Sequence, residues 1–171
     1  VTLGGKFLGY WASFCLKYIM ATKIEIKGTE NIINNQKYFV VSSHQSIFET
    51  FFLQTIFENP VFILKKELVK IPLFGWYLKK IGCISIDRNK ISKENLNFSD
   101  EVSKVIKNTN KTLIIFPQGT RKNFDDRSTF KKGFARIYND LEIACLPVAI
   151  NSGKVWPKNG RLIPNQNITV S

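Results

Sequence analysis

One histidine and one glutamate, His44 and Glu49, are the residues of this sequence best suited to acid–base chemistry. His44 is the only histidine in the chain, and histidine is the side chain that most readily exchanges a proton near neutral pH. On one continuous helix, two side chains five residues apart point about 140° away from each other. The pair can therefore meet only if His44 lies before the first turn of a helix that contains Glu49.

The residues around the pair predict that arrangement. Residues 38–41 form an apolar run typical of a buried strand, and residues 47–57 have a helical pattern. Ser46 and Glu49 fit the S-x-x-E capping box, which predicts a helix N-terminus at Ser46. A carboxylate in the first helical turn would hold one imidazole nitrogen and leave the other free to act as a base.

Each residue of the pair also has a simpler interpretation. Glu49 can act as a capping residue without any catalysis, and a lone histidine at a strand–helix junction is often a structural hydrogen-bonding group. A metal site is disfavoured, because no second histidine and no cysteine pair stands near His44 to complete a ligand set. The choice between a catalytic and a structural role for this pair therefore depends on motifs elsewhere in the sequence.

The composition excludes a disordered chain and predicts partners that carry negative charge. Hydrophobic residues make up 44% of the 171 residues, enough for one domain with a substantial core. The 25 Lys and Arg against 13 Asp and Glu give a net charge of +12, which fits nucleic acid, an anionic membrane surface or phosphate-bearing metabolites. Cys15, Cys83 and Cys145 form no C-x-x-C pair, which indicates a reducing compartment and no disulfide framework.

We expect residues 1–22 to form an amphipathic helix that associates with a membrane. Four aromatic residues fall on one helical face: Phe7, Trp11, Phe14 and Tyr18. Lys6 and Lys17 bracket a stretch too short to span a bilayer, which needs about 20 apolar residues. A basic helix with Trp and Tyr on one side is typical of an interfacial anchor. A core-packing helix of the same domain is the alternative.

Residues 23–171 alternate strand-like and helix-like segments, which predicts a layered αβα fold around a central, mostly parallel or mixed sheet. The predicted strands are 24–28, 38–41, 61–64, 82–88, 112–116 and 143–150, and the predicted helices after residue 22 are 47–57, 92–108 and 128–138. Pro147 favours an edge position or a bulge for the strand that contains it. Residues 71–78 are too apolar for an ordinary surface loop and complete the core or contact lipid or a ligand. The chain opens on Val1 and stops in a strand-like run, so we expect a longer natural protein at both ends.

Polar residues that suit phosphate chemistry follow four of the predicted strands. They are His44 with Glu49, Lys65 with Lys66, Asp87 with Arg88, and the segment Gln118, Gly119, Thr120 and Arg121. Ligands of α/β sheets bind beyond the strand ends, and a glycine such as Gly119 lets backbone approach a ligand closely. Arg88 and Arg121 suit a bidentate grip on phosphate, although each arginine alone is more often a surface charge. Together, one base and two arginines suggest chemistry on a phosphate-bearing alcohol.

These ordered motifs resemble those of the glycerolipid acyltransferase family, in particular its 1-acyl-glycerol-3-phosphate (lysophosphatidic acid) acyltransferases of the PlsC type. The family motif H-x4-D corresponds to His44-x4-Glu49, and G-x-I-x-I-D-R matches residues 82–88. F-P-E-G-T-R matches residues 116–121 with Gln118 in place of Glu, and L-P-V-A matches residues 146–149. Glu49 keeps the carboxylate that the family has as Asp, and Gln118 keeps a hydrogen-bonding amide without the charge.

The resemblance implies an O-acyltransferase of phospholipid biosynthesis that needs no cofactor and no metal. Acyl-CoA or acyl carrier protein would donate the acyl group to the free hydroxyl of lysophosphatidic acid, giving phosphatidic acid. His44 would be the base, oriented by Glu49. The residues that would bind phosphate are Arg88, Gln118, Gly119, Thr120 and Arg121, with Lys65 and Lys131 as additional basic contacts. The implied location is the cytoplasmic face of the inner membrane, as a peripheral or monotopic protein on an anionic surface.

Three alternatives stay open on the sequence alone. The acceptor could be glycerol-3-phosphate or another lyso-lipid. The departures at Glu49 and Gln118 leave room for a non-catalytic, lipid-binding remnant of the fold. A nucleic-acid-binding module ranks behind both, because the aromatic residues cluster in helical or apolar runs and do not interleave with basic residues.

Overall fold

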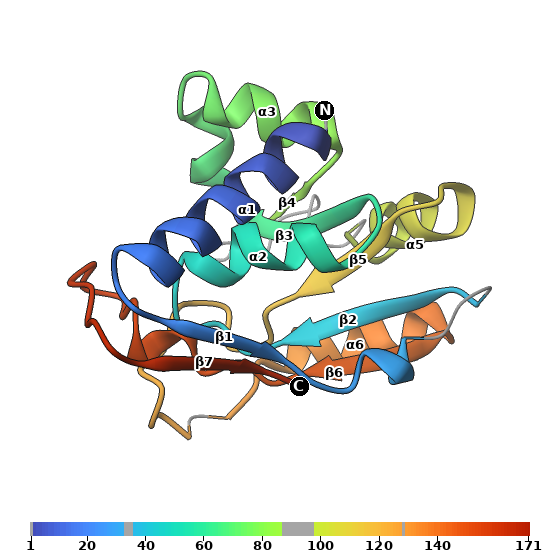
Figure 1. Cartoon of the computed structure of the whole chain (residues 1–171). Coiled ribbons are helices and arrows are strands. Elements are labelled where there is room, and N and C mark those ends of the chain that lie inside the picture. The colour runs from blue at the N-terminus through green and yellow to red at the C-terminus, as the bar shows by residue number, and fades with distance from the viewer. Residues whose placement is uncertain (1, 33–35, 87–97, 128) are drawn as a thin grey trace.

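A five-stranded parallel sheet forms the centre of the protein (Figure 1). The computed structural model describes residues 2–32, 36–86, 98–127 and 129–171. The strands are β2 (Tyr38–Ser42), β3 (Pro60–Lys65), β4 (Ile84–Ile86), β5 (Thr112–Ile115) and β6 (Ala144–Val148), in the spatial order β4-β3-β5-β2-β6. Each of their pairings is parallel, so the predicted α/β fold is confirmed.

Helices cover both faces of this sheet, as the strand sequences require. Side chains of a strand alternate between the two faces, and here both sets are apolar. One set, from Phe39 to Ile115, packs with helices α5 (Phe98–Asn108) and α6 (Lys132–Leu141). The other set, which includes Val40 and Ile114, packs with Leu53 and Phe57 at helix α2 (Phe48–Ile56). The result is the predicted αβα layering.

The edge position predicted for the proline-containing strand is confirmed. Pro147 has no N–H to donate to a neighbouring strand, which is tolerated at the edge of a sheet. Strand β6 lies at the end of the spatial order, and Pro147 is in register with Val41 of β2. By contrast, β5 lies in the middle of the sheet, where Leu113 and Ile114 are fully buried.

Two predicted strands pair with each other and stay outside the main sheet. Strand β1 (Lys23–Ile26) runs parallel to β7 (Asn167–Val170) in a two-stranded sheet. Ile168 and Val170 of β7 are buried in a cluster with Leu16 and Phe52. Through this cluster, β7 at the end of the described chain packs against the first helix, which contains Leu16.

Helix α1 (Thr2–Tyr18) lies across α2 (Figure 1). Gly9 allows the close approach, because a Cβ there would stand 2.5 Å from the backbone oxygen of Phe51. Gly5, one turn earlier, faces Gln54 and Tyr77, and the Tyr77 hydroxyl donates to Oε1 of Gln54 at 3.2 Å. Tyr77 belongs to helix α3 (Phe74–Ile81), so α1, α2 and α3 meet at this point.

Several boundaries differ from the sequence prediction. The helix expected at 128–138 begins at Lys132 and ends at Leu141, and residues 71–78 split between a loop and α3. Short 3-10 helices occupy Thr29–Asn31 (η1), Lys66–Lys70 (η2) and Ser152–Lys154 (η3). Predictions that fall on Asn34, Asn35, Asp87, Arg88 and residues 92–97 lie outside the described residues.

Candidate active site

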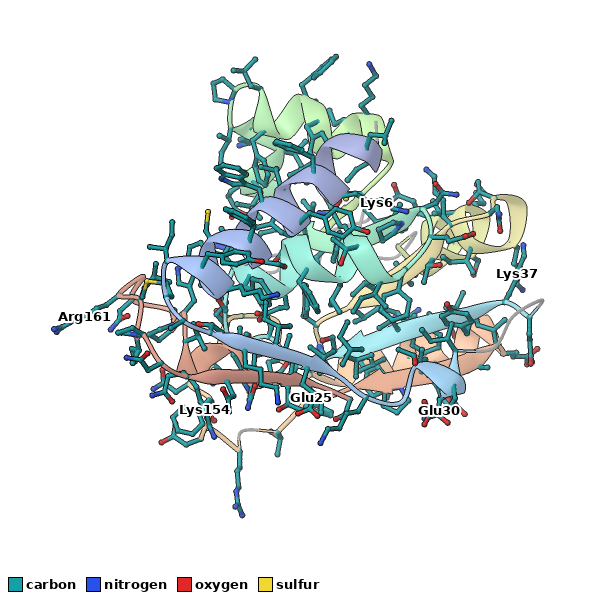
Figure 2. The ribbon with its side chains drawn as sticks, in the orientation of Figure 1. Lys6, Glu25, Glu30, Lys37, Lys154 and Arg161 are labelled. Atoms are coloured by element: carbon teal, nitrogen blue, oxygen red, sulfur yellow. The ribbon has the colours of Figure 1, made fainter. Side chains whose placement is uncertain are left out.

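The carboxyl ends of the parallel strands meet at one edge of the sheet, and this edge carries the candidate site. Figure 2 shows Lys37, which precedes β2, and Lys154, which follows β6, at opposite ends of the molecule. His44 follows β2, the segment 118–121 follows β5, and η3 follows β6. Lys37 marks the other edge, where its Nζ donates to the Ile106 and Lys107 carbonyls at the end of α5.

His44 and Glu49 are in direct contact, with Nδ1 of the imidazole 3.0 Å from Oε1 of the carboxylate. The Glu49 side chain is fully buried, and the His44 side chain keeps 19% of its surface exposed. Because an ionised carboxylate only accepts hydrogen bonds, Nδ1 carries the proton and donates it. In a neutral imidazole with this tautomer, the other ring nitrogen, Nε2, carries the lone pair.

The Glu49 carboxylate gathers donors from three further residues. The backbone N–H groups of Gln45 and Ser46 both donate to Oε1, the second at 2.7 Å. The Ser152 hydroxyl donates to Oε2 at 2.6 Å. A buried charge is tolerated when hydrogen bonds replace its lost hydration, so these contacts keep the carboxylate available to His44.

The start of α2 agrees in part with the predicted capping box. Glu49 reaches back to the backbone N–H of Ser46, as that motif requires. The Ser46 hydroxyl, however, accepts from Phe48 N at 3.1 Å, and the helix begins at Phe48. His44 therefore lies before the first turn, which is the condition for its contact with Glu49.

The segment after β5 lies beside the imidazole. The ring of Phe116 stacks on His44 with centroids 4.1 Å apart. Gly119 has a φ of +71°, a conformation that glycine adopts without strain, and its N–H donates to Phe116 O at 3.0 Å. After this turn, Lys122 N donates to His44 O at 2.8 Å, so the segment is held against the histidine loop.

The remaining predicted site residues differ in burial and in their hydrogen-bond and ion-pair partners. On this segment, Arg121 is half-buried and Thr120 is exposed. Oε1 of Gln118 is buried and has no hydrogen-bond partner among the described residues. Lys131 is exposed, but its N–H donates to Pro117 O at 2.9 Å. Lys65 is exposed and pairs with Glu67 at 3.7 Å.

One predicted component of the site has no described geometry. Arg88 lies outside the described residues. In the part of the chain that the structure describes, no three His, Cys, Asp or Glu side chains form a group able to hold a metal ion.

Sequence reasoning missed the loop after β6, which borders the histidine loop. Ser43 Oγ bonds both backbone groups of Ile150, and Gly153 N donates to Gln45 Oε1 at 3.2 Å. Ser152 completes these links through Glu49. One signal was available, because Asn151, Ser152 and Gly153 are small residues directly after the predicted strand 143–150, as Ser42 and Ser43 are directly after the predicted strand 38–41.

The fold agrees with the comparisons to known proteins. The chain belongs to the Acyltransferase family, whose model matches residues 23–151. The predicted resemblance to glycerolipid acyltransferases is therefore confirmed.

Individual relatives carry a narrower description. The chain is 32% identical over 153 residues to the 1-acyl-sn-glycerol-3-phosphate acyltransferase of Pseudomonas aeruginosa, covering 88% of this chain and 59% of that protein. It is 29% identical to the enzyme of the same name from Cocos nucifera, covering 97% of this chain and 54% of that protein. The chain thus spans a little over half the length of these curated relatives.

A solved structure shares the architecture. The crystal structure of the 1-acyl-sn-glycerophosphate (LPA) acyltransferase PlsC from Thermotoga maritima superposes with a TM-score of 0.77 at 26% sequence identity. The match covers 99% of this chain and 66% of that one. The matched region includes α1 as well as the central sheet.

Proposed function

We propose that this acyltransferase moves an acyl group from a thioester, acyl-CoA or acyl-ACP, to the free hydroxyl of 1-acyl-glycerol-3-phosphate. The observation that carries the proposal is the buried Glu49 carboxylate on Nδ1 of His44. This contact leaves Nε2 as a base at the sheet edge where ligands of α/β folds bind. The descriptions of the Pseudomonas, Cocos and Thermotoga relatives support this choice of substrate.

The proposed reaction needs one proton carrier. Nε2 of His44 takes the proton of the acceptor hydroxyl while its oxygen attacks the thioester carbonyl carbon, a contribution of roughly 10²–10⁴-fold. The C–S bond then breaks, and the thiolate leaves and takes the proton from the imidazolium. Phosphatidic acid and a free thiol are the products. A thiolate is a good leaving group, since thiols have an ordinary pKa near about 8.5, so a single base suffices.

The segment after β5 is the proposed site for the acceptor phosphate. Arg121 offers a planar, bidentate grip on phosphate oxygens, and Gly119 opens the backbone of the turn to the ligand. Gln118 brings an uncharged amide to a position where the family motif has a carboxylate, which lessens repulsion of the phosphate. Its buried Oε1 can accept a hydrogen bond from a substrate hydroxyl. Thr120, Lys65 and Lys131 complete the proposed polar contacts, with Arg88 after β4.

We also propose that the enzyme works on a membrane surface, with residues 1–22 as the docking helix and residues 23–171 as the catalytic domain. The aromatic face of α1 is exposed, including Phe7 at 66% and Trp11 at 57%. Helix α3 lies beside the N-terminal half of α1 (Figure 1), and there Leu73 and Trp76 are exposed at 85% and 64%. Exposed apolar side chains with an excess of Lys and Arg suit an anionic bilayer surface.

This surface is compatible with a peripheral or monotopic position on the cytoplasmic face of the inner membrane. None of the helices in the described ranges has both the length and the hydrophobicity to cross a bilayer. Docking through α1 and α3 would place both acyl substrates, which partition into lipid, close to the enzyme.

The test is an acyl-transfer assay with labelled acyl-CoA and a panel of lyso-lipids and glycerol-3-phosphate, with products identified by mass. Wild-type chain should form phosphatidic acid, and His44→Ala should abolish transfer while circular dichroism and the melting temperature stay close to wild type. Transfer to another acceptor would replace lysophosphatidic acid in the proposal. A folded wild-type chain without transfer to any acceptor would point to a lipid-binding remnant.

A further inference from the structure

Ser152 is fully buried at the carboxyl end of the edge strand β6, and its hydroxyl reaches Oε2 of Glu49 at 2.6 Å. The other donors to this carboxylate, from His44, Gln45 and Ser46, all meet Oε1. Ser152 is therefore the donor that the described residues offer to the second oxygen. The two residues are 103 positions apart in the sequence.

We propose that Ser152 is a positioning residue for acyl transfer, which acts through Glu49 and does not touch the substrate. This inference rests on the proposed function of the His44–Glu49 pair. A carboxylate held at one oxygen only is free to turn about its last bond, and the hydroxyl of Ser152 removes that freedom. Oε1 then stays directed at Nδ1, and the negative charge that stabilises the imidazolium during the reaction is retained.

The position of Ser152 is fixed by contacts on both sides. Asn151 Oδ1 accepts from Thr169 N of β7 at 2.7 Å, and Trp156 N donates to Ser152 O at 2.9 Å. Gly153 lies against the side chain of Gln45, where an added Cβ would stand 3.0 Å from the Gln45 Cβ. The backbone around Ser152 is thus held by β7 and by the histidine loop. The Ser152 hydroxyl therefore has a fixed position relative to the Glu49 carboxylate.

Packing alone does not require a hydroxyl at this position. An alanine has nearly the volume of a serine, and a buried hydroxyl without a partner is unfavourable. The hydroxyl is compensated here by a carboxylate, and hydrogen bonds to ionised groups are about twice as strong as neutral ones. The main effect of the hydrogen bond is therefore to orient the Glu49 carboxylate and, through it, the His44 imidazole.

The kinetic test compares Ser152→Ala with Ser152→Thr, which keeps the hydroxyl, and with Ser42→Ala as the matched control. Ser42 is also fully buried, at the end of the neighbouring strand β2, but its hydroxyl bonds the Ser43 carbonyl. Ser152→Ala should lower kcat about ten-fold, equivalent to about 1.4 kcal/mol, with KM for both substrates nearly unchanged. Ser152→Thr should recover most of kcat, and Ser42→Ala should keep it.

A double-mutant cycle separates positioning from general destabilisation. In a Glu49→Ala background, Ser152→Ala should cause no further loss of kcat, because its effect passes through the absent carboxylate. A loss of the same size in both backgrounds, or a kcat for Ser152→Ala equal to that of Ser42→Ala, would overturn the proposal.

A second test uses the imidazole ¹⁵N NMR signals and needs no substrate. Because His44 is the only histidine in the chain, these signals need no assignment among several histidines. Its two ring ¹⁵N resonances report which nitrogen carries the proton and how strongly Nδ1–H is bonded. Ser152→Ala should shift the Nδ1 resonance, whereas Ser42→Ala should leave it in place. An unchanged Nδ1 resonance overturns the inference even if transfer is observed. A shifted resonance in a chain without transfer sustains the Ser152 contact and rejects the proposed function.

Discussion

The imidazole of His44 lies nearly flat against the phenyl ring of Phe116, with centroids 4.1 Å apart and 16° between the ring planes. Phe116 in turn stacks on Phe62 of β3 with a centroid distance of 6.0 Å. The hydrogen bond to Glu49 fixes the direction in which Nδ1 points, and the Phe116 ring fixes the plane of the imidazole. Together they determine the direction of the Nε2 lone pair.

Phe116→Leu should therefore lower kcat by about five-fold through loss of the stacked surface, whose interaction contributes about 0.5–1.5 kcal/mol. KM should change little, because the proposed phosphate contacts lie further along the segment. Phe62→Leu is the control, since Phe62 is 4% exposed and contacts Phe116, not His44. That variant should lose stability in urea unfolding but keep kcat. Equal losses of kcat in both variants would contradict a specific role for the stack.

Glu49→Gln and Glu49→Asp separate the charge of the carboxylate from its reach. Glu49→Gln removes the charge and places an NH₂ group among donors, so kcat should fall about a hundred-fold and the free energy of unfolding by about 2 kcal/mol. Glu49→Asp keeps the charge but withdraws it by one C–C bond, about 1.5 Å, so its loss of kcat should be smaller. Steady-state kinetics and urea unfolding measure both. A Glu49→Gln enzyme with normal kcat would leave Glu49 with a capping role only.

Arg121→Ala should raise KM for lysophosphatidic acid about ten-fold or more, because a charge-assisted hydrogen bond to phosphate contributes roughly 1.5–3 kcal/mol. The KM for the acyl donor should stay near the wild-type value. Arg136→Ala is the matched control, because Arg136 is an exposed arginine on α6 that pairs with Asp140 at 3.6 Å. An unchanged KM in Arg121→Ala would move the phosphate contact to another residue.

The sequence was sufficient for the layers of the fold because both faces of each central strand are buried. An apolar run such as residues 113–115 then needs helices on either side, and the structure has them. The edge position of Pro147 followed from its missing N–H. Local spacing also predicted the contact between His44 and Glu49, since a strand–loop–helix junction allows few other arrangements.

Long-range pairings could not be predicted from local patterns. The periodicity of β1 and β7 indicates strands but not their partners, so their separate sheet was missed. Ser152 meets Glu49 only because β6 runs beside β2 in a particular register. Likewise, the stacking of Phe116 on His44 depends on the adjacent position of β5 and β2. The predicted helix began four residues before α6, because Thr129, Phe130 and Lys131 have the same mixture of polar, aromatic and basic side chains as the helix that follows.

Burial gives Cys83 a pH-dependent effect on stability. Desolvation raises the pKa of this thiol to about 11, against smaller opposing effects of the Phe62 backbone and Lys111. The folded state therefore keeps the proton over a pH range in which the unfolded state, with an ordinary pKa near about 8.5, releases it. Stability is fully present below the lower value and falls as pH rises toward the higher one.

Urea unfolding of the wild type and Cys83→Ala between pH 8 and pH 11 should show this effect, with a relative loss of up to about 3 kcal/mol in the wild type. Lysines and tyrosines titrate in both proteins, so the difference between the two curves isolates the thiol. Parallel curves would show that Cys83 ionises as freely in the folded protein as in the unfolded one.

Trp11→Glu should weaken binding to vesicles of phosphatidylglycerol and phosphatidylcholine by about ten-fold or more, because it places a charge in the aromatic face of α1. Trp11 stacks between Phe7 and Phe14, with centroids 6.4 and 5.9 Å away, so its ring lies within this face. Tyr138→Glu is the control, since Tyr138 is 49% exposed on α6, across the sheet from α2.

Vesicle sedimentation measures both variants, and transfer to a short-chain, water-soluble acceptor should remain near wild type in each. Raising the salt concentration should weaken binding of the wild type as well, because the attraction of its surplus Lys and Arg to anionic lipid is screened. If Trp11→Glu and Tyr138→Glu bound vesicles equally well, the exposed face of α1 would have to contact something other than lipid, and the proposed docking through α1 and α3 would be wrong.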